Sequence, residues 1–335
     1  MKRMRMQGQF IKVSGLLIVG MAVILLLLSG SFQASSLLVV SESILTFNMI
    51  FISILIEAIP FVLIGVFIAG IIQIFVTEEH LKKLIPKHKG LAVLTSCLLG
   101  ALFPACECGI VPIVRRLIGK GVPLFAGVGF LLTGPLINPL VFISTYVAFG
   151  EDFKIATLRM GVGLVIAVII AAIISVLFKN NQLKKSKDML YVKTERSDQP
   201  FGKRLKAMLY HAVDEFFDMG KYLIIGALLA AFVQTYISTK SILGLGDGIL
   251  LSTFVMMGLA FLLSLCSEAD AFIAASFRHL FPDTSLLGFL IYGPMLDLKN
   301  TIMLMALFNV RFVFVLMVII TTTVLGTLLV IHPWL

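Results

Sequence analysis

The chain is dominated by long apolar segments separated by short polar strips. After a first apolar segment at 11–30, the later segments span residues 44–76, 91–114, 122–149, 155–178, 215–238, 248–277, 284–308 and 310–331. At about 1.5 Å per helical residue, each later segment is long enough to cross a hydrocarbon layer of roughly 30 Å. Charged residues make up only 13% of the chain, about half of their share in soluble domains. The sequence therefore predicts an all-α, polytopic membrane protein and excludes a soluble enzyme with a single anchor.

The formal net charge of +9 comes from basic residues that sit mainly in the polar strips. In such strips they orient a membrane protein, so no nucleic-acid partner is implied. Residues 1–12 carry four Lys/Arg and no acid, which predicts a cytoplasmic N-terminus. Small residues around Ala34 resemble a signal-peptidase cleavage site, so one alternative is that the N-terminal segment is a cleaved signal peptide. We favour a retained signal-anchor helix, because the apolar run extends back through Phe10 and multi-pass membrane sequence follows.

Two halves of the chain resemble each other at a nearly constant separation. Four pairs are 161 positions apart: Glu57 and Asp218, Gly65 and Gly226, Ala69 and Ala230, and Gln73 and Gln234. Cys106 and Cys266 are 160 positions apart. Three further pairs are 159 positions apart: Gly134 and Gly293, Pro135 and Pro294, and Asn138 and Asp297. Duplication in a membrane protein is typical of transporters whose binding site lies between the repeats. The alternative is an old duplication without symmetry in the mechanism.

The duplication divides the chain into four parts. Residues 1–43 form the N-terminal signal-anchor helix and loop, 44–178 form membrane repeat 1, and 207–335 form membrane repeat 2. Residues 179–206 carry nine Lys/Arg and are predicted to be a cytoplasmic basic linker.

Segment 91–114 is predicted to enter the membrane and turn back. A full crossing would place Arg115, Arg116 and Lys120 outside, against the positive-inside rule. A re-entrant hairpin with its turn at Pro104–Pro112 keeps them inside. Three crossings and one hairpin per repeat make the two repeats inverted, with 248–277 descending from outside and residues 266–270 at its tip. The alternative is that both segments cross fully, which gives nine helices.

The most informative local sequence runs from Pro104 to Pro112 and reads Pro-Ala-Cys-Glu-Cys-Gly-Ile-Val-Pro. Two prolines and a glycine interrupt helical hydrogen bonding, which is tolerated at membrane depth only inside protein or beside a watery cavity. The thiols of Cys106 and Cys108 can bind one thiophilic centre or cycle between dithiol and disulfide. With Cys266 at the matching place, they are the candidate metal ligands. The alternative is that the cysteines are small packing residues.

Acidic residues accompany both predicted hairpin tips. Glu107 lies in the first tip, and Glu268 and Asp270 lie in the second. A carboxylate inside a membrane is costly unless it is paired, hydrated or protonated. These acids are therefore predicted to contact substrate, compensate charge or carry a coupling proton. The alternative is that the tips are water-exposed loops.

A later apolar segment is interrupted in each half, at Thr133–Pro139 and at Tyr292–Asp297. These runs contain the pairs Gly134-Pro135 and Gly293-Pro294. Interruptions at corresponding positions are the best sequence pointer to a transporter's site. Asn138 and Asp297 follow them and are predicted to face the cavity and bind substrate. The alternative is that both pairs are kinks that shape helix packing.

Glu57 and Asp218 occupy matched positions at the starts of two long helices. We expect them to have a structural or coupling role, because an ion pair is at least as good an explanation as substrate contact. The basic residues available to them are Lys221, Lys299, Arg311 and Arg159.

No catalytic constellation is present in the sequence. The five histidines lie in or near polar strips and form no zinc-protease pattern, and the phosphate-binding glycine motif of an ATPase is missing. The chain is therefore predicted not to be an enzyme and to need no cofactor. Transport would draw on an ion gradient or on a separate energising subunit.

The run at 104–112, followed by Gly-Pro-Leu-Ile-Asn-Pro at 134–139, resembles the YraQ/YcgR-like family of bacterial permeases. The likeness spans about residues 44–331 and includes Cys-Ser-Glu-Ala-Asp at 266–270. The family includes organoarsenical efflux permeases. The resemblance implies transport across the bacterial plasma membrane, with Cys106 and Cys108 at the substrate. It also implies a second small membrane protein as a partner, and a homo-oligomer stays open.

These observations predict a permease that moves a small solute by gradient-coupled alternating access. The expected cargo is a soft metal, metalloid or organometalloid. Two other classes stay open: a membrane thiol-disulfide oxidoreductase, in which Cys106 and Cys108 carry electrons, and a non-transporting subunit of a membrane complex. Duplication with matched helix breaks favours transport over both.

Overall fold

The computed structural model describes residues 42–75, 86, 88–103, 106–178, 180–184, 201–236 and 248–334. Apart from an isolated antiparallel bridge between Leu183 and Phe308, the regular elements in these ranges are helices. This confirms the predicted all-α class. The predicted signal-anchor helix, Pro104 and most of the basic linker lie outside the described residues.

Four helices in the described part of the chain are long and apolar enough to cross a membrane. They are α2 (Glu42–Phe75), α8 (Phe153–Leu177), α10 (Phe201–Tyr236) and α16 (Val310–Ile331). Each has large apolar side chains on its outer surface, such as Ile56 on α2 and Phe232 on α10, where hydrocarbon would meet them. The arrangement confirms a polytopic membrane protein. α10 begins within the predicted linker, before residue 207.

Shorter helices take the places of the two predicted hairpins. They are α4 (Lys89–Ala101), α5 (Glu107–Gly119), α12 (Ile249–Leu263) and α13 (Ser267–Ser276). A helix of 13 residues, such as α4, measures only about 20 Å and cannot cross alone. The Lys120 side chain, just after α5, donates to the Gln73 carbonyl oxygen at 2.7 Å. The α4–α5 pair therefore leaves on the side where α2 ends, as expected for a re-entrant segment.

The turn of the first hairpin is shorter than predicted. α4 ends at Ala101 and α5 begins at Glu107, so Pro112 lies inside α5 and not at the turn. A proline inside a helix removes the hydrogen bond to the carbonyl oxygen four residues earlier, here that of Cys108, and can bend a helix that continues past it. Pro112 therefore does not end the helix.

Both halves also contain two shorter helices joined by a break of a few residues. In the first half these are α6 (Leu124–Thr133) and α7 (Pro139–Ala148), and in the second they are α14 (Asp283–Met295) and α15 (Leu298–Leu307). The break follows Gly134-Pro135 directly, whereas α14 continues through Gly293-Pro294 and breaks at Leu296. The second break, at Leu296 and Asp297, therefore lies at the end of the run 292–297 that the sequence predicts to be interrupted.

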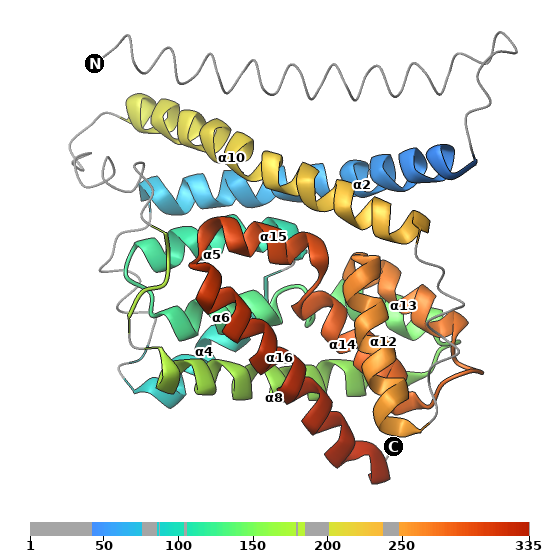
Figure 1. Ribbon diagram of the computed structural model, residues 1–335. Helices are drawn as coiled ribbons and strands as arrows, with labels where there is room; N and C mark the ends of the chain where they lie inside the picture. The colour runs from blue at the N-terminus through green and yellow to red at the C-terminus, as the bar shows by residue number, and fades with distance from the viewer. Residues whose placement is uncertain are drawn as a thin grey trace, which may run out of the picture.

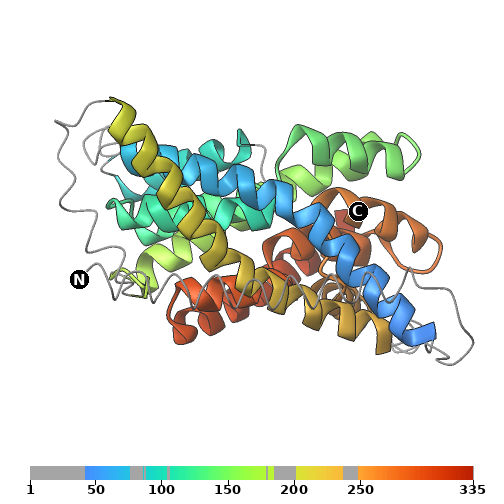
Figure 2. The same ribbon diagram turned by 90° about the horizontal axis from the view of Figure 1, so that it is seen from above.

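The two halves share one order of elements: a long helix, two short helices, a broken helix and a long helix. Figure 1 shows α4, α5 and α6 at the left of the molecule and α12, α13 and α14 at the right, with α2 and α10 running across them in opposite directions. Seen from above, α2 and α10 cross each other (Figure 2). The opposed directions are those expected of inverted repeats, which stay a prediction.

Close backbone contact holds α2 against α5. A Cβ atom at Gly65 would overlap the carbonyl oxygen of Gly109, and one at Gly109 would lie 2.7 Å from the carbonyl oxygen of Phe61. Small residues at such crossings let helices approach closely in membranes.

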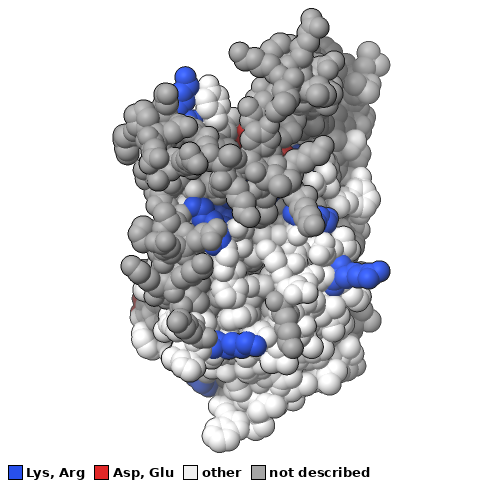
Figure 3. Space-filling model, turned by 90° about the vertical axis from the view of Figure 1, so that its left-hand side faces the viewer, with Lys and Arg blue, Asp and Glu red and all other residues white. Residues whose placement is uncertain are grey.

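The face at which α2 ends and α10 begins presents several Lys and Arg side chains (Figure 3).

Candidate functional site

The two kinds of break place four polar residues at helix N-termini. Cys106 and Cys266 are the N-cap residues of α5 and α13, and Asn138 and Asp297 are those of α7 and α15. Asn138 accepts from the Leu140 amide at 3.0 Å, and Asp297 accepts from the Asn300 amide at 2.5 Å. The predicted substrate residues at the Gly-Pro breaks therefore cap helices. Each N-terminus also contributes a partial positive charge.

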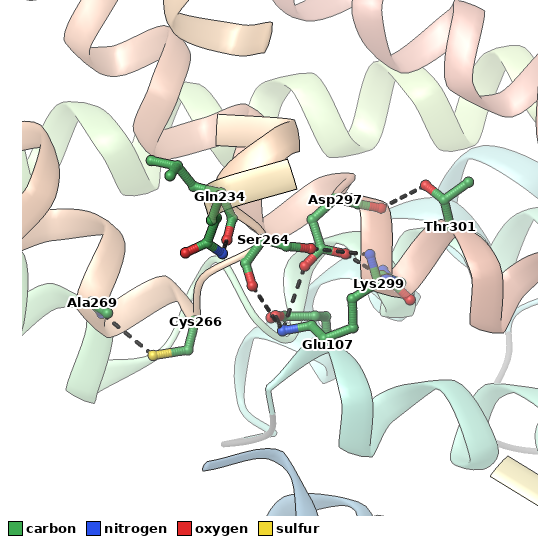
Figure 4. Close-up of polar contacts among 10 residues, drawn as sticks. Glu107, Gln234, Ser264, Cys266, Ala269, Asp297, Lys299 and Thr301 are labelled. Carbon is green, nitrogen blue, oxygen red and sulfur yellow. Dashed lines mark hydrogen bonds and ion pairs between the residues drawn. The ribbon is translucent and has the colours of Figure 1, made fainter. Parts of the chain in front are cut away.

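Lys299 on α15 lies at the centre of the buried charges. Its Nζ is 3.2 Å from Glu107 Oε1 and 3.5 Å from Asp297 Oδ2, and it donates to the Ser264 carbonyl oxygen at 3.2 Å (Figure 4). All three ionic side chains are almost fully buried. The contact joins α5 of the first half to the α12–α13 break of the second. One cation thus compensates two carboxylates in a water-poor environment.

Ser264 holds an unusual backbone conformation in the second break. Its φ of 52° lies in the left-handed region, which non-glycine residues rarely adopt. Lys299 binds it twice, because the Lys299 amide also donates to Ser264 Oγ at 3.0 Å. The strained residue is therefore fixed by the same side chain that pairs with Glu107, which is typical of functional sites.

Arg159 on α8 forms a second buried contact between the halves. Its side chain is fully buried and donates from Nη1 to Thr145 Oγ1 at 2.7 Å and from Nη2 to the Ser267 carbonyl oxygen at 2.9 Å. Ser267 begins α13, so Arg159 reaches the second hairpin at the same turn that contains Asp270. The Asp270 carboxylate is within electrostatic range of Arg159, without an ion pair between them.

The cysteines are free thiols in different surroundings. Cys106 and Cys108 interact with each other and lie within electrostatic range of Lys299. Cys266 Sγ accepts from the Ala269 amide at 3.4 Å and interacts with Glu57 on α2. Among the described residues, no group of three or more His, Cys, Asp or Glu side chains could hold a metal ion. The predicted set of three thiolates is therefore not assembled in this conformation.

The predicted acids separate into three situations. Glu107 is buried and paired, Asp270 is buried without a hydrogen-bond partner in the described part of the chain, and Glu268 is half-buried. Glu57 and Asp218 lie within α2 and α10 rather than at their starts, because α2 begins at Glu42 and α10 begins at Phe201. Asp218 pairs with Lys221 at 3.1 Å on a largely exposed surface.

Sequence reasoning missed Lys299, Arg159 and Ser264 as parts of the site. Lys299 and Arg159 were considered only as partners of Glu57 and Asp218, which they do not pair with in the structure. A basic residue within an apolar segment is itself a signal of function, and that signal could have found both. Nothing in the local sequence announces the conformation of Ser264.

Comparison with known proteins places this architecture in a family. A family model described as a predicted permease, ArsP_1, matches residues 43–332. The chain is 53% identical over 290 residues to UPF0718 protein YcgR of Bacillus subtilis (strain 168), covering 86% of this chain and 98% of the relative. A Streptococcus mutans protein named as a two-component membrane permease complex subunit is 39% identical over 272 residues, covering 81% of this chain and 90% of that protein. No solved structure matches. The chain belongs to the ArsP_1 family of predicted permeases.

Proposed function

We propose that this chain is the transport subunit of a bacterial plasma-membrane permease for a small thiophilic solute, a soft metal, metalloid or organometalloid. The observation that supports the proposal most is the adjacent thiols of Cys106 and Cys108 beside the buried pair of Lys299 and Glu107. Two thiols suffice for a soft centre that takes two sulfur ligands, whereas a closed zinc site needs four ligands.

The charges around the site support coupling to an ion gradient. Three almost fully buried carboxylates face two buried cations, and the five residues are Glu107, Asp270, Asp297, Lys299 and Arg159. With all five groups ionised, one negative charge is uncompensated, which a low-dielectric interior tolerates poorly. A proton or a cationic cargo relieves it. Gradient-coupled exchange requires the site to bind the proton and the cargo alternately.

We place the basic face of the molecule in the cytoplasm. The strips at 77–90, 115–120 and 179–206 all carry Lys/Arg, and the positive-inside rule then puts the N-terminus in the cytoplasm as well. The two halves would be inverted repeats, with alternating access produced by movement of one half against the other.

A shallow apolar surface on α2 is formed by Met49, Ile52, Ser53, Ile56 and Glu57. Met49 and Ile56 are largely exposed, so this surface faces the hydrocarbon of the membrane. It includes Glu57, which is within interaction range of Cys266.

Transport by membrane vesicles tests the proposal. Vesicles of both orientations would be assayed with zinc, copper(I), trivalent methyl and phenyl arsenicals, and oxyanions. We expect movement of at least one thiophilic solute, abolished by joint Cys106→Ser and Cys108→Ser replacement and retained after Cys97→Ser. Cys97 is the matched control because it is a buried packing residue on α4. Unchanged transport in the double variant would overturn the thiol mechanism.

A second candidate is that the chain transports only within a complex. The name of the Streptococcus mutans relative, a subunit of a two-component membrane permease complex, favours this reading. Transport by vesicles that contain this chain alone would exclude it. A thiol-disulfide oxidoreductase would use the same two thiols, and trapping a mixed disulfide between Cys106 or Cys108 and a partner would support it.

A further inference from the structure

Among the described residues, Asp270 differs from the other buried acids of the site because its carboxylate has no hydrogen-bond or ion-pair partner. In the described part of the chain, neither of its carboxylate oxygens accepts a hydrogen bond, and no ion pair includes it. Glu107 by contrast pairs with Lys299, and Asp297 accepts from the Asn300 amide. Asp270 is only 1% exposed. An ionised carboxylate in that situation would cost several kcal/mol.

Two unused hydrogen-bond donors lie on the residues next to Asp270. Arg159 Nε and Ser267 Oγ are buried and have no partner among the described residues. Ser267 is one helical turn before Asp270 on α13, and Arg159 binds the Ser267 carbonyl oxygen. Two donors and one carboxyl group therefore lie in one cluster without being joined. They are placed to bind a carboxylate that has lost its proton.

The other charged and titratable groups around α13 form no hydrogen bond or ion pair with the Asp270 carboxylate in the described part of the chain. They are Glu107 on α5, Asp297 and Lys299 on α15, Glu57 on α2, Tyr146 on α7, Asp283 and Tyr292 on α14, and Glu268 on α13 itself. Lys299 is committed to Glu107, Asp297 and Ser264. The Tyr292 hydroxyl is committed to Thr321 Oγ1 at 2.8 Å.

The duplication supplies an internal control for the role of Asp270. Its matched residue is Ile110, at the same separation of 160 as Cys106 and Cys266. Each side chain lies against the glycine of its Gly-Pro pair: a Cβ at Gly134 would overlap Ile110 Cδ1, and a Cβ at Gly293 would lie 2.7 Å from Asp270 Oδ2. An apolar residue therefore fills this packing position in the first half. The carboxyl group in the second half has a role other than packing.

We propose that Asp270 is protonated in this conformation and is the group that carries the coupling proton. When the site opens to water, the O–H bond breaks, the proton goes to water, and the negative charge stays on the carboxylate. Ser267 Oγ–H and Arg159 Nε–H then donate to that carboxylate. This inference deepens the proposed transport function, because it names the coupling ion and its carrier.

Infrared spectroscopy tests the charge state without reference to any cargo. The C=O stretch of a protonated carboxylic acid is separate from the bands of a carboxylate. At neutral pH, the purified full chain in lipid should show a carboxylic-acid band that is lost in both Asp270→Asn and Asp270→Ile and kept in Glu268→Gln. Glu268 is the matched control, because it lies in the same turn and is half-buried. The isoleucine variant copies the first half and should fold.

The opposite spectrum overturns the inference: a carboxylic-acid band unchanged in both Asp270 variants, with loss of a carboxylate band. A transport assay with trivalent phenylarsenical then tests coupling. Wild-type movement should respond to an imposed pH gradient, and Asp270→Asn should bind the probe but ignore the gradient. If the probe is not moved by any variant, the cargo proposal fails while the infrared result stands.

Discussion

Replacing Glu215 with glutamine should destabilise the fold by about 3 kcal/mol, because it removes the carboxylate from a nearly buried ion-pair cluster. Glu215 on α10 receives Arg115 Nη1 at 2.7 Å and also pairs with Arg116 Nη2. The side chains of Arg115 and Arg116 are 11% and 10% exposed, and that of Glu215 is 3% exposed. Two cations would then lose the group that compensates them. The estimate is at the lower end for a broken buried pair because glutamine keeps one acceptor oxygen.

The assay is reversible unfolding of the purified protein in mixed micelles, combined with a double-mutant cycle. Glu215→Gln and Arg116→Gln together should cost less than the sum of the single changes, with a coupling free energy of about 1–3 kcal/mol. Lys221→Gln is the matched control on the same helix, because Lys221 is 50% exposed in its pair with Asp218. It should cost less than about 0.5 kcal/mol. A Glu215 variant as stable as the wild type, or additive single changes, would refute the reasoning.

Two further changes probe the helix contacts. Gly65→Ala should destabilise the fold by about 1–3 kcal/mol, because the added methyl group would overlap the Gly109 carbonyl oxygen. The control is Gly161→Ala, whose methyl group would meet nothing within 4 Å. It should have little effect in the same unfolding assay. Lys299→Met should lower the free energy of unfolding by about 3–5 kcal/mol, because it leaves Glu107 buried and unpaired. Adding Glu107→Gln should recover part of that loss. A double variant no more stable than Lys299→Met would show that the pair is not coupled.

The positions of the breaks could largely be predicted from local sequence. Proline and glycine act on the backbone where they stand, so the interruption before Cys108 and the one after Gly134 are visible without tertiary information. The limits appear at Pro112 and Pro294, which lie inside helices. A proline can bend a helix without ending it, so its presence fixes a break only to within a few residues.

The charged network of the site could not be predicted in the same way. Arg159 and Ser267 are separated by 108 positions, and Lys299 meets Glu107 across the two halves. Such pairs depend on how helices cross, which periodicity and composition do not encode. The sequence indicates that buried acids need compensation, and two basic residues within apolar segments, Arg159 and Lys299, supply only part of it.

The matched halves nevertheless carry information that a single-copy chain would lack. Ile110 and Asp270 occupy equivalent packing positions against Gly134 and Gly293. Comparing the side chains at these matched positions separates the features that packing requires from those present in only one half. The position requires a side chain that fits beside a glycine, and the carboxyl group is an addition to that requirement.

The measurement that most directly tests a shared soft-solute site at Cys106 and Cys108 is X-ray absorption at the arsenic edge of the protein loaded with trivalent phenylarsenical. The account predicts an arsenic atom bound to two sulfur atoms, and loss of both contacts in the joint Cys106→Ser and Cys108→Ser variant. An arsenic atom with no sulfur ligand, or one whose sulfur contacts survive in that variant, would contradict it.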